Sequence, residues 1–217
     1  MIFIRKRVIA TVLAVCLLIG SVGLFSSCSR APKEEEIYDR VVELIEASYP
    51  LNTVFYGAGL PTYAADSEYA RITQMYYGFT QTEYYEIITP FSRYLSIDEI
   101  KENAEKVYSK EYLEDVLYPS VFIGYAIEDG VGGSAFSRAR YLEEENQFLQ
   151  STKKENYLTG VRIYDYSTIR VVAPSNNKAC YVEIASWLEN MPDLVTTVRL
   201  RLVRQDDGEW YLDSFTG

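Results

Sequence analysis

The chain has 217 residues, of which 21 are lysine or arginine and 31 are aspartate or glutamate, so its formal net charge at pH 7 is −10. This acidity disfavours binding to nucleic acid or to anionic lipid headgroups through charge alone. The chain contains no histidine, which excludes Ser-His-Asp and Cys-His nucleophilic systems as well as histidine-ligated zinc.

The beginning of the chain has the pattern of an export signal. A basic patch at residues 5–7 precedes an apolar run over residues 8–25, and two serines stand directly before Cys28. A cationic start, an apolar middle and small residues before a cleavage site are typical of a secretory signal peptide. We therefore predict that residues 1–27 are a signal peptide, and that the thiol of Cys28 carries a lipid.

The residues around the predicted cleavage site, Leu24-Phe25-Ser26-Ser27-Cys28, resemble the lipobox of bacterial lipoproteins, with phenylalanine at a position where leucine is commoner. The apolar run of 18 residues is also at the lower limit of a membrane-spanning helix. The alternative is thus an uncleaved N-terminal anchor. Both interpretations place the rest of the chain at the outer face of the bacterial cytoplasmic membrane.

Removal of residues 1–27 would leave 190 residues with 18 basic and 31 acidic side chains, a net charge of −13. This size predicts one domain. We assign residues 28–33 to a short tether and residues 34–217 to a single α+β domain. Cys180 would have no disulfide partner if Cys28 is lipidated, and it lies in an apolar run, so we expect a buried free thiol.

The first half of the domain is predicted to be mainly helical. Three glutamates open a helix at residue 34, as the helix dipole favours; Ile37, Val41, Leu44 and Ile45 form its apolar face, and Pro50 is expected to end it. Residues 51–61, which include Gly57 and Gly59, are interpreted as a bend. The aromatic, β-branched residues 69–88 favour short strands, although a helix over residues 66–75 remains an alternative.

Two helices with clear start signals follow. Ser96 and Glu99 form a predicted capping box in which the Glu99 side chain reaches back to Ser96. Ser109 is expected to cap a second helix, which ends at Pro119. The apolar face of the first helix is expected to consist of Ile97, Ile100, Ala104, Val107 and Tyr108, and that of the second of Tyr112, Leu113, Val116 and Leu117.

The glycine-rich segment 128–137 lacks the spacing of a phosphate-binding loop, and we interpret it as a loop between the helical half and a sheet. Residues 138–150 are assigned to one strand, with a helix as the alternative. From residue 157 the polar and apolar residues alternate. Four strands are predicted at residues 161–172, 179–187, 194–204 and 210–215, and their short polar connections indicate an antiparallel meander.

In the third of these strands, alternate residues must face opposite sides of the sheet. Leu194, Thr196, Val198, Leu200 and Leu202 share one face, and Val195, Thr197, Arg199, Arg201 and Val203 share the other. The arginines on the second face could receive a carboxylate ligand. In so acidic a chain, we favour a solvated outer face on which they pair with neighbouring acids.

Helices followed by an antiparallel sheet define an α+β arrangement. This order resembles the NTF2-like (cystatin-like) fold, in which N-terminal helices pack on a curved antiparallel sheet. The resemblance rests on residues 96–113, 179–187, 198–204 and the terminal Gly208-Glu209-Trp210-Tyr211-Leu212-Asp213. The tyrosine-rich strand, the capped helix pair and the terminal meander also resemble exported inhibitors of cell-wall DL-endopeptidases in Gram-positive bacteria.

The residues contain no motif for a catalytic, cofactor-binding or metal-binding site, so Cys28 is the only residue to which we assign a function. The sequence favours a non-enzymatic surface lipoprotein that binds or regulates an envelope protein or a cell-wall component. Its twenty tyrosines suit a recognition surface, although we expect most of them to pack in the interior. The alternatives are an enzyme that uses carboxylates and tyrosines, or a small-ligand carrier, with the site in a pocket of the sheet.

Overall fold

The computed structural model describes residues 30–63, 72–77, 81–129, 133–144, 146–152, 158 and 160–217, and of residues 72–77, 81–84, 124–129 and 133–138 it describes the backbone. The predicted signal peptide and Cys28 lie outside the described residues. Within the described part of the chain, no helix combines the length and the apolar character that a membrane crossing requires.

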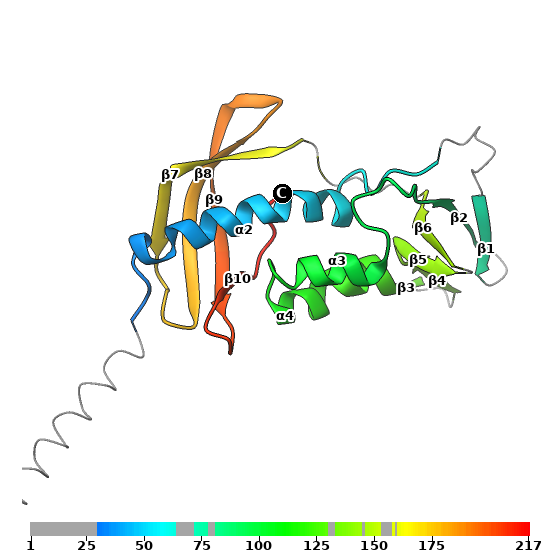
Figure 1. Cartoon of the computed structure of the whole chain (residues 1–217), viewed down its shortest axis with the longest axis horizontal. Coiled ribbons are helices and arrows are strands. Elements are labelled where there is room, and N and C mark those ends of the chain that lie inside the picture. The colour runs from blue at the N-terminus through cyan, green and yellow to red at the C-terminus, as the bar shows by residue number, and fades with distance from the viewer. Residues whose placement is uncertain are drawn as a thin grey trace, which may run out of the picture.

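A single long helix, α2 (Glu34–Phe55), runs along the middle of the molecule (Figure 1). The predicted apolar face is confirmed, because Ile37, Val41, Leu44 and Ile45 are at most 1% exposed. The prediction that Pro50 ends the helix is wrong. Proline removes a helical hydrogen bond at a cost of about 3 kcal/mol, but the continuing turn buries Leu51, Val54 and Phe55, and each buried side chain of this size contributes about 1.5–3 kcal/mol.

The bend predicted for residues 51–61 is therefore shorter and begins after Phe55. The amide of Gly57 donates to the carbonyl of Asn52 at 3.0 Å, and the amide of Gly59 donates to that of Thr53, also at 3.0 Å. Gly59 has a φ of +82°, which lies in the left-handed region that glycine adopts without strain. The helix thus ends in a turn that depends on this glycine.

One face of α2 packs on an antiparallel sheet of four strands, in the order β10-β9-β8-β7. The strands are β7 (Arg162–Val172), β8 (Ala179–Leu188), β9 (Met191–Arg204) and β10 (Trp210–Leu212). Each strand pairs with its neighbour in sequence, so the predicted meander is confirmed. The ends of its strands differ from the predicted ones by at most three residues.

The alternation predicted for β9 is confirmed in its second half, whereas residues 191–197 are all exposed and the pairing with β8 shifts between Ser186 and Leu188. Leu200 and Leu202 are completely buried on the face that α2 covers. On the other face, Arg201 forms an ion pair with Asp213, and the Arg199 guanidinium lies 4.7 Å from the ring centroid of Tyr181. This second face is the arginine-bearing outer face that the sequence predicts, but of the two arginines only Arg201 pairs with an acid among the described residues, and Arg199 donates to the Ala173 carbonyl.

The capped helices occur where they were expected. In α3 (Ile97–Ala104), the amide of Glu99 donates to Ser96 Oγ at 3.1 Å. The Glu99 carboxylate accepts from the amide of Leu95, at 2.7 Å, and not from Ser96 as predicted. Ser109 caps α4 (Lys110–Tyr112) by accepting from the amide of Tyr112 at 3.2 Å.

Beyond α4 the chain widens into two π-helical turns, η1 (Leu113–Leu117) and η2 (Pro119–Ile123). The prediction that Pro119 ends the helix is wrong, because this proline is the first residue of a new turn, where its missing N–H costs little. Val116 was also expected on the inner face but is 41% exposed. Leu113, Leu117 and Val121 recur every four residues and so lie on one face of these turns, and each is buried.

A second sheet lies at the other end of α2 (Figure 1). Its strands are β1 (Ile72–Tyr77), β2 (Gln81–Ile87), β5 (Tyr141–Glu144) and β6 (Gln147–Ser151), in the order β1-β2-β6-β5. The predicted short strands in residues 69–88 are confirmed where the chain is described, and the helical alternative for residues 66–75 is wrong at residues 72–75. Residues 138–150 contain two strands instead of one, joined at Asn146, whose φ is +63°.

The segment 128–137, predicted to be a loop, is mostly extended. Strands β3 (Gly124–Asp129) and β4 (Gly133–Arg138) pair as an antiparallel hairpin. Only residues 130–132 lie between them, and they are outside the described residues. The glycines of this segment were interpreted as a loop signal, whereas the β-branched and aromatic residues that flank them favour strands.

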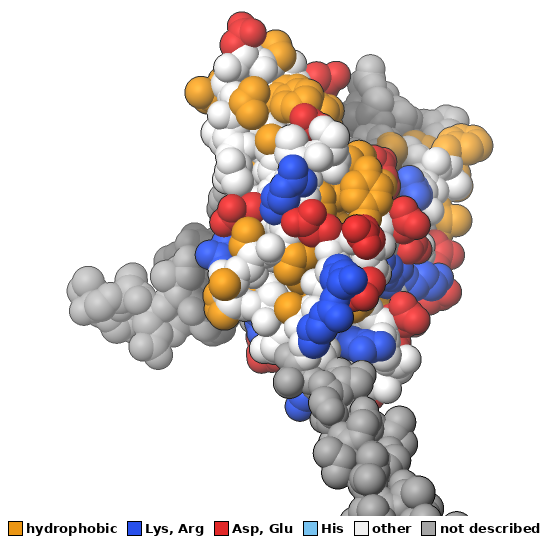
Figure 2. Space-filling view, turned by 90° about the vertical axis from the view of Figure 1, so that its left-hand side faces the viewer, with side chains coloured by type: hydrophobic (Ala, Val, Ile, Leu, Met, Phe, Trp, Pro, Cys, Tyr) orange, Lys and Arg blue, Asp and Glu red, His pale blue; other side chains and the backbone are white. Residues whose placement is uncertain are grey.

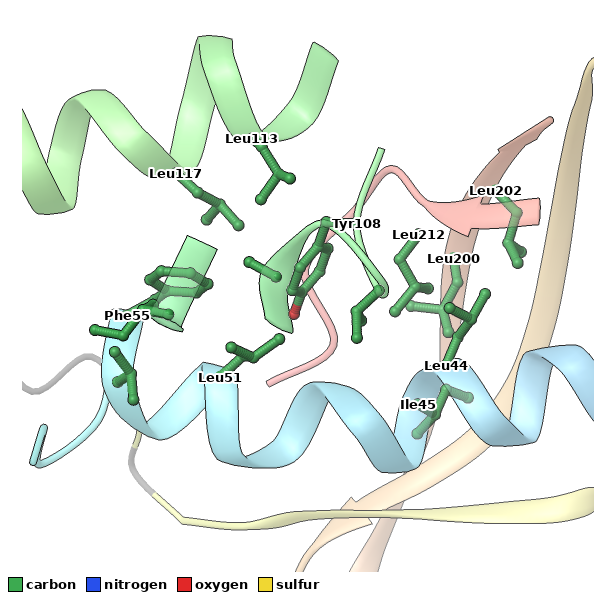
Figure 3. Packing of buried hydrophobic residues seen from close by; sticks show 14 of the residues in the cluster. Leu44, Ile45, Leu51, Phe55, Tyr108, Leu113, Leu117, Leu200, Leu202 and Leu212 are labelled. Atoms are coloured by element: carbon green, nitrogen blue, oxygen red, sulfur yellow. The ribbon is translucent and has the colours of Figure 1, made fainter. Parts of the chain in front are cut away.

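The core lies between α2, the four-stranded sheet and the helical segment that contains α3, α4 and η1 (Figure 3). Tyr108 stands at its centre, with Leu51 of α2 on one side and Leu113 and Leu117 of η1 on another. Tyr85, Tyr108 and Tyr141 are among the largest fully buried side chains. Several tyrosines therefore pack in the interior, as we expected for most of them.

Candidate functional site

A cluster of polar side chains fills the space between α2 and the C-terminal residues. Ser48 Oγ and Thr216 Oγ1 are 2.6 Å apart, and Asn52 Nδ2 donates to the same threonine oxygen at 2.8 Å. The Tyr108 hydroxyl donates to Asn52 Oδ1 at 2.8 Å. All four residues are at most 3% exposed. Since buried polar groups are costly unless they are paired, this network holds the C-terminal segment against the helix.

The tyrosines of this cluster are neutral donors at ordinary pH. The Tyr164 hydroxyl of β7 donates to the carbonyl of Thr216 at 2.6 Å, and burial raises the pKa of both Tyr108 and Tyr164 above the usual value of 10. Together with Ser48, Asn52 and Thr216, these tyrosines fill the space between α2 and the covered face of the sheet. The enzyme and carrier alternatives require a pocket in that space.

A surface groove of about 590 Å³ lies between the start of the helical segment α4–η1 and the turn that joins β9 to β10. A neighbouring hollow of about 320 Å³ shares Lys110, Glu114 and Gln205 with it. We refer to both together as the acidic groove. It is lined by Glu105, Tyr108, Ser109, Lys110, Glu111, Leu113, Glu114, Asp115, Tyr118, Val203, Arg204, Gln205, Asp206 and Asp207.

Hydrogen bonds hold the helical wall of the acidic groove against the sheet. The amide of Ser109 donates to the carbonyl of Leu212 at 2.7 Å, and its hydroxyl donates to the Asp213 carboxylate. The amide of Lys110 donates to Gln205 Oε1 at 3.2 Å. Because these contacts join α4 directly to β10 and to the β9–β10 turn, the two walls form one rigid unit.

The opposite wall is a turn at residues 205–209, the Asp-Asp-Gly connection recognised in the sequence. Gly208 has a φ of +85°, and its amide donates to the carbonyl of Gln205 at 3.0 Å. The Tyr211 hydroxyl donates to Asp207 Oδ2 at 2.7 Å, and the amide of Glu209 donates to Oδ1 at 2.9 Å. These hydrogen bonds lower the pKa of the Asp207 carboxyl, which therefore stays ionised to a lower pH.

Negative charge predominates along this surface. Six of the lining residues are acidic, namely Glu105, Glu111, Glu114, Asp115, Asp206 and Asp207, whereas only Lys110 and Arg204 are basic. Lys110 Nζ lies 3.7 Å from Glu114 Oε1, so one base is already engaged. Among the described residues, no ion pair involves Glu111, Asp115 or Asp206. The acidic groove is thus a concave anionic surface with the partly exposed Tyr118 in its floor.

The cysteines assigned from the sequence have different outcomes. Cys180 is a completely buried free thiol, as predicted, and burial raises its pKa. Cys28 lies outside the described residues, so its lipidation remains a prediction. Within the described part of the chain, no group of three or more acidic or cysteine side chains is placed to hold a metal ion.

The residues of the acidic groove were not assigned to a site from the sequence. Its two walls were each recognised separately, one by the Ser109 cap and the other by the Asp-Asp-Gly turn. About 95 residues separate them along the chain, and no local signal reports that they meet.

No protein-family model matches the chain, and neither the curated proteins nor the solved structures include a match to it. Function must therefore be inferred from the chain's own geometry.

Proposed function

We propose that the chain is a non-enzymatic lipoprotein of the bacterial envelope, held at the outer face of the cytoplasmic membrane by a lipid on Cys28. We propose that it binds or regulates an envelope protein, and that the partner inserts a basic segment into the acidic groove. The observation that carries this proposal is the predominance of acidic over basic side chains along two rigidly joined walls.

The fold is part of the proposal. We infer an NTF2-like (cystatin-like) core made of α2, the helices α3 and α4 and the meander β7–β10, with the strands β1–β6 as additions on either side of the two short helices. Its support is the long N-terminal helix packed across an open antiparallel sheet whose strands follow one another in sequence. Because folds of this kind serve many functions, the fold does not determine what is bound.

Charge is the main reason to expect a basic partner. A concave surface of one sign concentrates ligands of the opposite sign and accelerates their association. Individual exposed ion pairs contribute about 0.2–1 kcal/mol, so several are needed for stable binding, and six carboxylates line this groove. The partly exposed ring of Tyr118 adds contact area for the aliphatic stems of lysine and arginine.

The packing beneath the sheet supports a binding role over the two alternatives. Ser48, Asn52 and Thr216 are buried and hydrogen-bonded to one another on the face that α2 covers. An enzyme or a carrier of the kind inferred from the sequence would need that space for its substrate or ligand. To admit one, the chain would have to displace its own C-terminal segment.

The test is the capture of partners from bacterial envelope extracts by the full chain in detergent. A triple variant, Glu111→Lys with Asp115→Lys and Asp206→Lys, reverses three charges in the acidic groove. The matched control reverses three exposed acids elsewhere, Glu35→Lys with Asp39→Lys and Glu189→Lys, so both variants have the same net charge.

We expect wild type and control to retain the same basic partner, and the groove variant to retain at most about a tenth as much, because attraction becomes repulsion. The wild-type complex should also weaken as the salt concentration rises. Equal capture by the groove variant and the control would contradict the acidic groove as the binding surface.

The attachment is tested separately by labelling growing cells with a fatty acid. The Cys28→Ala variant should lose the label, and the Cys16→Ala variant, which alters the other cysteine of the leader, should keep it. A Cys28→Ala chain that is unlabelled but still membrane-bound would favour the uncleaved anchor. Label retained by Cys28→Ala would contradict lipidation at this residue.

A further inference from the structure

The end of the molecule at which the described chain begins contains a hollow of about 350 Å³ (Figure 1). It brings together the residues before α2, the first turn of α2, the turn between β7 and β8, and the strands β9 and β10. Its lining residues are Arg30, Ala31, Pro32, Glu36, Asn177, Arg204 and Trp210. We refer to it as the tether hollow.

The residues directly before α2 are packed against the domain. Ala31 and Pro32 are half-buried and line the tether hollow together with Trp210. Further along the helix, Arg40 Nε donates to the carbonyl of Trp210 at 2.9 Å. The start of α2 and strand β10 are therefore fixed relative to each other, and part of the predicted tether, residues 28–33, belongs to the folded domain.

Very little chain separates this packed segment from the predicted attachment. Only Ser29 stands between Cys28 and Arg30, and two residue steps reach at most about 7 Å. This limit holds whether Cys28 carries a lipid or follows an uncleaved membrane helix. With either form of attachment, the tether hollow therefore lies at the surface of the bilayer.

Basic side chains at this end lack acidic partners. Arg30 and Arg204 line the tether hollow, and Lys33 and Lys178 are next in sequence to lining residues. All four are exposed, and none of them forms an ion pair with another described residue. Glu36, the one acid among the lining residues, accepts from the Lys33 amide at 2.8 Å. Figure 2 views this side of the molecule and shows basic side chains, interspersed with acidic ones, mostly on its lower half.

The two tryptophans of the chain lie toward opposite ends of the four-stranded sheet. Trp210 pairs with Arg204, one step beyond the pair of Val203 with Ala179 at the start of β8. Trp187 is eight residues further along β8, roughly 26 Å from Ala179 at the usual rise per residue. Trp210 is half-buried and lines the tether hollow. An indole has an apolar ring and a polar N–H, which suit the headgroup level of a membrane.

We propose that the domain docks on the bilayer through the tether hollow, with Arg30 and Arg204 on the phosphate groups of anionic phospholipids and Trp210 at the headgroup level. This docking rests on the membrane attachment proposed above. A guanidinium binds phosphate oxygens through paired, charge-assisted hydrogen bonds. Arg204 Nε donates to the Gly208 carbonyl at 2.6 Å, which holds the side chain in place and leaves its terminal nitrogens for a phosphate.

The acidity of the whole chain does not oppose this docking, because the anchor and not the charge brings the domain to the membrane. Once the chain is attached, the tether hollow meets lipid phosphates at a high effective concentration, and weak contacts are enough to orient the domain. Docking also sets the acidic groove beside the bilayer, because Arg204 lines both the groove and the tether hollow.

The two tryptophans provide the test. The full chain, purified in detergent, is added to preformed vesicles of phosphatidylcholine and phosphatidylglycerol that include a phospholipid with a nitroxide on its headgroup, which quenches nearby indoles. Trp187→Phe leaves Trp210 as the fluorescent reporter, and Trp210→Phe leaves Trp187. We expect the vesicles to quench the Trp210 emission by about half or more and the Trp187 emission by about a tenth or less, because only Trp210 lies at the headgroup level.

Charge reversal distinguishes docking from mere closeness to the anchor. In the Trp187→Phe chain, Arg30→Glu and Arg204→Glu should each reduce the quenching of Trp210 about twofold or more, because lipid phosphates repel a carboxylate. Arg93→Glu is the matched control and should leave the quenching unchanged. Arg93 is also exposed and forms no ion pair with another described residue. Vesicles without phosphatidylglycerol should reduce the quenching of Trp210 as the two reversals do.

Flotation of the vesicles reports the attachment separately. A chain that does not float with them would contradict both the attachment and the docking. A chain that floats would contradict the docking alone if Trp210 is quenched no more than Trp187, or if Arg30→Glu and Arg93→Glu give equal quenching. If Arg204→Glu fails to fold because it loses its hydrogen bond to Gly208, Arg30→Glu decides the outcome.

Discussion

Individual residues at both ends of the domain have conformations that only a small set of side chains can adopt. Gly59 and Gly208 have nearly equal positive φ values, +82° and +85°, but their surroundings differ. A Cβ atom at Gly59 would lie 2.2 Å from Gln150 Oε1, which accepts the Leu60 amide at 2.6 Å. At Gly208 the nearest atom would be 3.6 Å away. Substitution of the two glycines therefore distinguishes the cost of backbone strain, present at both, from the cost of side-chain crowding, present only at Gly59.

We therefore predict that Gly208→Ala lowers the free energy of unfolding by roughly 1–2 kcal/mol, the cost of the left-handed conformation alone. Gly59→Ala should lower it by at least about 1 kcal/mol more, because the buried Gln150 side chain must also give up its hydrogen bond. Urea unfolding followed by circular dichroism measures both. Equal losses in the two variants would show that the Gln150 contact contributes nothing.

At the scale of secondary-structure elements, a serine caps each of two consecutive helices, but the two serines have different structural roles. Ser96 is partly exposed and caps α3 through one hydrogen bond from Glu99. Ser109 is 1% exposed, caps α4, and also donates to the Asp213 carboxylate beyond β10. Ser109 thus joins a helix to the sheet, whereas Ser96 stabilises its own helix.

This difference predicts unequal costs for the same substitution. Ser96→Ala should lower the free energy of unfolding by about 1 kcal/mol, as expected for the loss of a cap. Ser109→Ala should cost a further 1–3 kcal/mol, roughly, because it leaves the largely buried Asp213 carboxylate without one of its donors. Thermal or urea unfolding of the two variants decides the point. A smaller loss for Ser109→Ala than for Ser96→Ala would contradict the joining role.

For the molecule as a whole, the buried tyrosines make folding sensitive to alkaline pH. Tyr108, Tyr141 and Tyr164 lie between different elements of the fold, and burial raises the pKa of each. For Tyr141 burial raises the pKa to about 12, although the nearby Arg140 guanidinium lowers it. An unfolded tyrosine has a pKa of about 10.

Because the pKa of Tyr141 is higher in the folded state, its contribution to stability is fully present below about pH 10. This contribution is lost as the pH rises from about 10 through 12. We predict that Tyr141→Phe destabilises the protein at pH 8, since the hydroxyl donates to the Val54 carbonyl at 3.0 Å. The difference in unfolding free energy between wild type and variant should shrink between pH 10 and 12. A difference that stays constant over this range would contradict the assignment.

Local patterns in the sequence were sufficient for much of the fold. The apolar face of α2, the serine caps and the four strands of the meander each depend on residues that are near one another in the chain, so periodicity and turn chemistry predict them. The buried state of Cys180 followed in the same way from its apolar neighbours. Three of the errors, at Pro50, Pro119 and the segment 128–137, share one cause: a single breaker signal was given more weight than the residues around it.

Tertiary packing decided the first of these points. Burial of Leu51, Val54 and Phe55 outweighs the hydrogen bond lost at Pro50, and this energy exists only when the sheet and the other helices are in place. The acidic groove also exists only in the tertiary structure. Its walls meet because Ser109 and Lys110 bond to residues about 95 to 104 positions away. The sequence by itself determined most of the elements, and its export signal remains a prediction. Only the tertiary structure decided which surfaces meet, because packing energy depends on contacts that no local pattern contains.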